Sequence, residues 1–269
     1  MIIRAKPLLG TLVSIQVDAQ SRNLDETLAV EKAFEVVAHI GSVMSAHDPD
    51  SDLGKMSRAF PGDVLSLDPH TVTVLRASQY WRYVSAGAFN PVKAAQTLAL
   101  KGSRPGLVVS SVACANYEIL SSTQLRMHGP VLMDLGGIAK GYAVDQAIEL
   151  LARFGISNAV VNAGGDLRVV GHRAITVEVR HAKNCLRDSQ FRRFRRIHNA
   201  AMATSVAEHA DSEFVRTLYR RSQRWGNATV MAKDCMTADV LTKWVLQSSL
   251  MCPRLKEVMR EHHAKMWRN

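Results

Sequence analysis

Residues 134–171, DLGGIAKGYAVDQAIELLARFGISNAVVNAGGDLRVVG, constrain this chain more than any other stretch. A first glycine turn, 134–137, follows the apolar run 131–133, which we expect to form a strand. A helix should come next, because its apolar residues recur at i, i+3, i+4 and i+7: Val144, Ala147, Ile148 and Leu151. Gly155 stands where a residue in the left-handed conformation usually ends a helix.

A second glycine turn follows at residues 163–166, between the predicted strands 158–162 and 167–170. The order strand, glycine turn, helix, strand, glycine turn can present backbone N–H groups and a helix N-terminus to an anion. The segment therefore predicts a site for an anionic ligand.

The wording of this segment, DLGGIAKGYAVD followed by NAGGDLRVVG, resembles the signature of the FAD:protein FMN transferases, the ApbE family. The resemblance implies an α+β fold, with mixed sheets and flanking helices around a nucleotide cleft. It also implies transfer of FMN from FAD to a Thr or Ser hydroxyl of an acceptor flavoprotein, with release of AMP. The chain shows no repeat or clear linker, so we expect one domain over residues 1–269, with two lobes as an elaboration.

Composition narrows the class of protein only broadly. A content of 47% hydrophobic and 22% charged residues suits a globular chain, and the net charge of +10 suits a dinucleotide or a nucleic acid equally well. The sequence has no signal-peptide pattern near its start and no apolar run long enough to span a bilayer, so we expect a cytoplasmic protein without a membrane span. The cysteines are far apart and form no CxxC pair, which favours reduced thiols over two disulfides: Cys114, Cys185, Cys235 and Cys252.

Three stretches align with FAD-contacting positions of the resembled family. Leu9, in Leu-Gly-Thr, stands where the family has Met-Gly-Thr, although a plain strand entry explains the same residues. His47 replaces a Tyr that contacts FAD, and its flat ring could still stack, although a solvated surface histidine is the alternative. Ala88, Phe89 and Asn90 match an A-F-D-P loop, with Asn90 in place of the Asp and without its charge.

Two further FAD contacts are implied in the signature itself, at Asp134 and Lys140. For Mg²⁺, the resemblance implies the Gly137 carbonyl and Asp239 as ligands. The family's A-D-A-L-x-T motif has a Thr four residues after the Asp, whereas this chain has Lys243. Thr242 comes one place early, about 100° around the helix, so it cannot simply substitute for that Thr.

Lys243 therefore leaves two interpretations open. Its ammonium could take over part of the role of the metal toward the FAD pyrophosphate, which we favour, or it could turn toward solvent. The alternative to any site is an exposed Asp239–Lys243 pair on a helix, which stabilises by only tenths of a kcal/mol.

A catalytic residue cannot be assigned. The family's H-x-x-D-P-x-T-G loop is not found in residues 206–229, although 199–205 resembles the A-x-A-T-S turn that precedes it. Two other hypotheses therefore stay open: a non-catalytic or FAD-hydrolysing FAD-binding relative, and a basic nucleic-acid-binding protein. The latter would depend on the basic residues 180–198, which we interpret as a charged hairpin, so we expect no nucleic-acid partner.

Elsewhere the patterns predict ordinary elements. We expect a strand over 12–17, a helix that buries Phe34 and its apolar neighbours, and a helix over 68–84 capped by Asp68. A strand is expected over 175–180, shorter strand-like runs at 107–109 and 117–120, and a helix that opens after Asp234.

Overall fold

The computed structural model describes residues 1–18, 25–92, 116–179, 193–206, 227–248 and 252–268. The chain forms two compact units. The first contains Met1–Ala38 and Lys140–Asn269, and the second contains His39–Ala139. Helix α1 (Glu26–Val43) begins in the first unit and ends in the second. The single domain expected over residues 1–269 remains a prediction.

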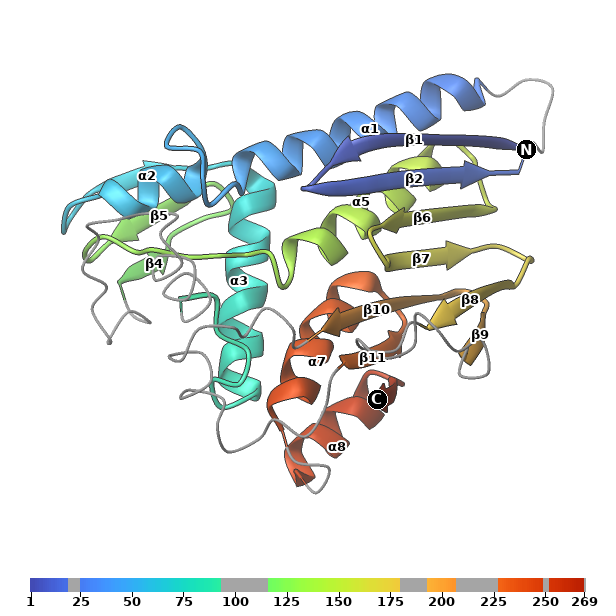
Figure 1. Cartoon of the computed structure of the whole chain (residues 1–269). Helices are drawn as coiled ribbons and strands as arrows, with labels where there is room; N and C mark the ends of the chain where they lie inside the picture. Colours follow the sequence, from blue (N-terminus) through green and yellow to red (C-terminus); the bar gives the residue numbers. More distant parts are fainter. Residues whose placement is uncertain (19–24, 93–115, 180–192, 207–226, 249–251, 269) are drawn as a thin grey trace. The chain divides into compact units, whose positions relative to one another are not determined.

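A seven-stranded antiparallel sheet forms the core of the first unit, and Figure 1 shows most of its strands in succession. In spatial order the strands are β1 (Ile2–Leu8), β2 (Thr11–Val17), β6 (Ala159–Ala163), β7 (Asp166–Val170), β10 (Ala200–Val206), β11 (Asn227–Ala232) and β12 (Lys265–Arg268). Alternate residues of β2 are fully buried, as expected for a strand with one face on the core: Val13, Ile15 and Val17. The predicted strand 12–17 is confirmed.

The helices of this unit follow their sequence patterns. Helix α5 (Ala139–Arg153) buries the predicted apolar stripe, and Gly155 follows it with φ +81°. The Ile156 N–H donates to the Leu151 carbonyl, which completes a Schellman end. Helix α7 (Cys235–Gln247) packs against β7, β10 and β11, and α8 (Pro253–Glu261) follows it.

Two tight hairpins lie at the same end of neighbouring strands. Leu9 and Gly10 connect β1 to β2, Gly164 and Gly165 connect β6 to β7, and all four have positive φ. Such two-residue turns match the twist of the strands that they connect. The turns pack closely, because a Cβ on Gly164 would lie 2.4 Å from the Thr11 hydroxyl oxygen.

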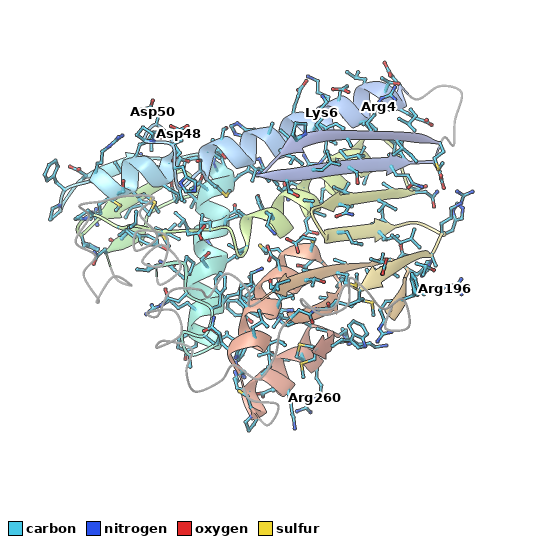
Figure 2. The ribbon with its side chains drawn as sticks, in the orientation of Figure 1. Arg4, Lys6, Asp48, Asp50, Arg196 and Arg260 are labelled. Atoms are coloured by element: carbon cyan, nitrogen blue, oxygen red, sulfur yellow. The ribbon has the colours of Figure 1, made fainter. Side chains whose placement is uncertain are left out.

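A smaller antiparallel hairpin pairs β8 (Ile175–Val179) with β9 (Arg193–Ile197), which agrees with the hairpin interpretation for residues 193–197 of the basic segment. Residues 180–192 of that segment lie outside the described part. Its buried face joins a core cluster: Leu167, Val169, Val179, Ile197 and Met202. Figure 2 shows Arg196 on this hairpin and Arg4 and Lys6 on β1, the edge strand of the large sheet.

The second unit combines helices with a three-stranded sheet. Helix α2 (Asp52–Arg58) is capped by Ser51, whose hydroxyl accepts a hydrogen bond from the Gly54 N–H at 2.9 Å. Helix α3 (Pro69–Val84) begins at Asp68, as predicted. The strands run in the order β3 (Val64–Ser66), β5 (Gln124–Met127), β4 (Tyr117–Ile119), so the run at 117–120 is confirmed and the run at 107–109 lies outside the described residues.

Two predictions of secondary structure are wrong. The apolar run 131–133 is buried but forms no strand, because the Val131 N–H donates to the Met56 carbonyl and the Asp134 N–H to the Pro91 carbonyl instead of to a ladder. Residues 199–205, expected as a turn, lie mostly in strand β10. The resemblance to the A-x-A-T-S turn had suggested a turn there, but Ala201 and Ala203 are fully buried in the sheet on which α7 packs.

Candidate functional site

Four charged side chains of the first unit form a cluster. Lys140 comes from the first turn of α5, Asp166 from the start of β7, and Asp239 and Lys243 from successive turns of α7. The Lys140 ammonium pairs with the Asp166 carboxylate, and the Lys243 ammonium pairs with the Asp239 carboxylate. The sequence had indicated three of these residues but not Asp166.

The aspartate side chains of the cluster are buried, whereas the lysine side chains are partly exposed. The side chains of Asp239 and Asp166 are 0% and 2% exposed, against 25% for Lys243 and 31% for Lys140. Burial alone would lower the pKa of Lys140, but the charges of Asp239 and Asp166 outweigh it, so the pKa is raised and the side chain stays charged. Burial and the neighbouring charge of Asp239 raise the pKa of Asp166.

Close packing of α5 on the first turn of α7 holds the cluster together. Gly141 makes this possible, since a Cβ there would lie 2.4 Å from the Cys235 carbonyl oxygen. The Gly141 N–H donates to Oδ2 of Asp239 at 3.3 Å, so the two carboxylate oxygens of Asp239 contact an N–H and an ammonium.

Asp145 links the same two helices by hydrogen bonds. This residue was not identified from the sequence. Its carboxylate accepts hydrogen bonds from the backbone N–H groups of Cys235 at 2.9 Å and Met236 at 2.8 Å, and it pairs with Arg168 of β7 at 2.8 Å. Burial outweighs these contacts and raises the pKa of Asp145 to about 6. A carboxylate beside the apolar stripe of α5, next to Val144, was the signal that could have revealed it.

The implied Mg²⁺ ligands do not fit a metal site in this chain. Asp239 is already bound by Lys243 and the Gly141 N–H. The Thr242 hydroxyl donates to the carbonyl oxygen of Asp239 at 2.6 Å and lies 2.6 Å from the Ser205 hydroxyl, so it is turned away from the role of a ligand beside the carboxylate. Gly137 belongs to the second unit. Within the described ranges, no group of three or more His, Cys, Asp or Glu could hold a metal ion.

The interpretation of Asp239 and Lys243 as an exposed pair is wrong. They do form an i, i+4 ion pair, but the carboxylate is fully buried by the packing of α7 on the sheet and on α5. A buried carboxylate depends on its partner far more than a surface one does.

In the first unit, Leu9 has φ +54°, a strained conformation for a residue with a side chain, and such strain occurs often at functional sites. Leu9 lies in the β1–β2 hairpin, while Lys140 lies in the cluster described above.

The other predicted FAD contacts belong to the second unit. His47 is exposed on the loop before α2, near Asp48 and Asp50, which Figure 2 labels. Asp134 accepts a hydrogen bond from the Gly136 N–H at 2.8 Å, so its carboxylate shapes the glycine turn before α5.

The loop that matches A-F-D-P follows α3. Phe89 is buried, whereas Ala88 and Asn90 are partly exposed. Asn90 Oδ1 accepts a hydrogen bond from the Val92 N–H at 3.1 Å, a contact that an Asp could make equally well. Asn90 also lines a pocket of about 500 Å³ between α3 and the segments that follow it.

The family model of the ApbE family matches residues 9–251. This chain belongs to the ApbE family. A FAD:protein FMN transferase of Vibrio cholerae is 25% identical over 260 residues, which cover 87% of this chain and 78% of that protein. A FAD:protein FMN transferase of Treponema pallidum is 25% identical over 186 residues, and the match spans only 51% of that protein and 62% of this chain.

Solved structures agree on the fold. The flavin transferase ApbE from Vibrio cholerae superposes with a TM-score of 0.79 at 22% identity, covering 99% of this chain and 92% of that one. The ApbE protein of Thermotoga maritima gives a TM-score of 0.79 at 23% identity, over 99% of this chain and 93% of that one. The predicted α+β, ApbE-like fold is confirmed. Among the described residues, no helix is long and apolar enough to cross a membrane.

Proposed function

We propose that this protein transfers FMN from FAD to a Thr or Ser hydroxyl of an acceptor flavoprotein. The observation that carries the proposal is the family match over residues 9–251, with relatives named FAD:protein FMN transferase. The fold and the charged cluster at the start of α5 and on α7 support it.

In the proposed reaction the acceptor hydroxyl oxygen bonds to the phosphorus on the riboflavin side of FAD. The bond from that phosphorus to the bridging oxygen breaks, AMP leaves with that oxygen, and the hydroxyl proton is released. Catalysis of such a displacement is mostly positioning and neutralisation of phosphate charge. Lys140 and Lys243 supply positive charge, and each ammonium has N–H donors beyond the one given to its carboxylate.

We propose that FAD is bound by the residues at the contact positions that the family resemblance implies: Leu9, His47, Ala88, Phe89, Asn90, Asp134 and Lys140. Binding of Mg²⁺ by the Gly137 carbonyl and Asp239 is implied by the family, but the contacts of Asp239 do not fit it, so no step is assigned to a metal. The cytoplasm as location and the absence of a nucleic-acid partner remain predictions.

A second function is favoured by one observation, the absence of H-x-x-D-P-x-T-G from residues 206–229. Residues 207–226 lie outside the described part of the chain. Without a substitute for that loop the protein would bind FAD, or hydrolyse it, without transferring FMN.

One experiment separates the two functions. The protein is incubated with FAD and a flavoprotein subunit that accepts FMN on a threonine, and the acceptor is analysed by intact-mass spectrometry while AMP is measured by chromatography. We expect an FMN adduct and an equal amount of AMP. A Lys140→Met variant should lose at least about tenfold in adduct formation, because it removes a charge-assisted phosphate contact, whereas Lys32→Met, at a surface pair, should not. AMP without adduct, or bound FAD without either product, would establish the second function instead.

A further inference from the structure

Lys243 distinguishes the nucleotide site of this chain, and its position gives the residue a role. We propose that the Lys243 ammonium is the built-in cation of the site, in the place that the family pattern gives to a divalent metal. The ligand of this ammonium is the pyrophosphate of FAD, and this part of the inference rests on the proposed function. The claim that Lys243 excludes a metal does not depend on that function.

The first support is the state of Asp239. Its carboxylate is completely buried, with Oδ1 on the Lys243 ammonium and Oδ2 at 3.3 Å from the Gly141 N–H. A divalent ion could use this carboxylate only by displacing the ammonium. In the described part of the chain, no further acidic or His and Cys side chains complete a metal-binding group there.

The second support is the charge of the cluster. Two carboxylates, Asp166 and Asp239, are balanced by two ammoniums, Lys140 and Lys243, so the cluster is neutral without any metal. These charges act on one another, because both lysines oppose the rise in the pKa of Asp166. A divalent ion would add two positive charges to a neutral and largely buried cluster, whereas loss of the Lys243 charge would leave one negative charge for a cation to balance.

The third support is the reach of the side chain. The Lys243 side chain is 25% exposed while that of its partner is fully buried, so the lysine is the member of the pair that reaches solvent. An ammonium has three N–H donors, and those not used by Asp239 can donate to phosphate oxygens. Lysine binds phosphate as a compact point charge in many nucleotide sites.

The test uses Lys243→Thr, which restores the oxygen of the family motif, and Lys243→Met, which is neutral and offers no oxygen. The matched control is Lys32→Thr, which makes the same change at an exposed i, i+3 pair of α1. Metal binding without FAD is measured with Mn²⁺ alone by electron paramagnetic resonance. FAD affinity is measured by flavin fluorescence, with Mg²⁺ and with EDTA.

We expect the unmodified protein and Lys32→Thr to bind no Mn²⁺ at the site, and their FAD affinity to change less than about threefold between Mg²⁺ and EDTA. Lys243→Thr should bind Mn²⁺ and should bind FAD at least about tenfold more tightly with Mg²⁺, the change that corresponds to about 1.4 kcal/mol. Lys243→Met should bind FAD more weakly under both conditions. Thermal unfolding is used to check that each variant is folded. If Lys243→Thr does not fold, the FAD affinity of Lys243→Met tests the proposal.

The inference is overturned if the unmodified protein binds Mn²⁺ as tightly as Lys243→Thr does, or if its FAD affinity rises many-fold with Mg²⁺. It is also overturned if Lys243→Met binds FAD as well as the unmodified protein. Failure of the unmodified protein to bind FAD under either condition would refute the proposed function and the phosphate role of Lys243. The Mn²⁺ measurement would then still decide whether Lys243 excludes a metal.

Discussion

Replacement of Gly141 by alanine tests how the charged cluster is assembled. In an ordinary helix this substitution stabilises by about 1 kcal/mol, because glycine loses more conformational freedom on folding. In α5 the new Cβ would lie 2.4 Å from the Cys235 carbonyl oxygen and 2.8 Å from the Met236 Cα. These are backbone atoms in the first turn of α7, so no side chain can rotate away and the two helices must separate.

The magnitude follows from the hydrogen bonds that separation weakens. The Gly141 N–H bonds to Asp239, and Asp145 accepts from the N–H groups of Cys235 and Met236. Hydrogen bonds to charged groups are worth about 1.5–3 kcal/mol each. Loss of two of the three outweighs the helix-propensity gain, so we expect Gly141→Ala to lower the free energy of unfolding by about 3 kcal/mol.

Urea unfolding followed by circular dichroism measures this change. Ala152→Gly, on the exposed side of the same helix, gives the helix-propensity effect alone and should cost about 1 kcal/mol. A Gly141→Ala protein as stable as the unmodified one, or more stable, would refute the argument that Gly141 sets the approach of α5 to α7.

Three further predictions concern substitutions of single residues. Burial raises the pKa of Asp145 from 3.8 to about 6, so the folded protein binds more protons than the unfolded chain between these values. The stability from this group should therefore fall by about 2 kcal/mol as the pH rises from 4 to 6. Asp145→Asn should remove that pH dependence in urea unfolding; an unchanged slope would contradict it. Gly164→Ala should cost about 1–3 kcal/mol, from its φ of +67° and its contact with Thr11, and a Thr11→Ala background should recover part of the loss in the same assay. Asn90→Asp should keep the bond to the Val92 N–H and leave the melting temperature unchanged. If the carboxylate of the family pattern assists transfer, the rate of adduct formation should rise about tenfold or more; an equal rate would show that it does not.

Local elements were predictable because local chemistry determines them. The stripe of apolar residues on α5 and Gly155 after it are enough to define a helix and its end. The order of strands was not predictable. Strand β2 pairs with β6, although the whole sequence of the second unit lies between them, and β10 pairs with β7. An apolar run such as 131–133 satisfies its backbone through loops, which no local pattern indicates.

In the candidate site, the spacing of the charged residues could be read from the sequence, whereas their burial could not. Lys32–Glu35 and Asp239–Lys243 are both short-range helix pairs in the sequence, and spacing alone assigns both the value of a surface pair. The structure separates them: the side chains of the first pair are 46% and 63% exposed, whereas Asp239 is 0% exposed. A surface carboxylate that loses its partner is solvated by water, but a buried one keeps an uncompensated charge, which costs several kcal/mol. The chain therefore has to keep a cation at position 243 or admit one from solution, and that choice depends on α5 covering α7 at Gly141, a contact between residues nearly a hundred positions apart.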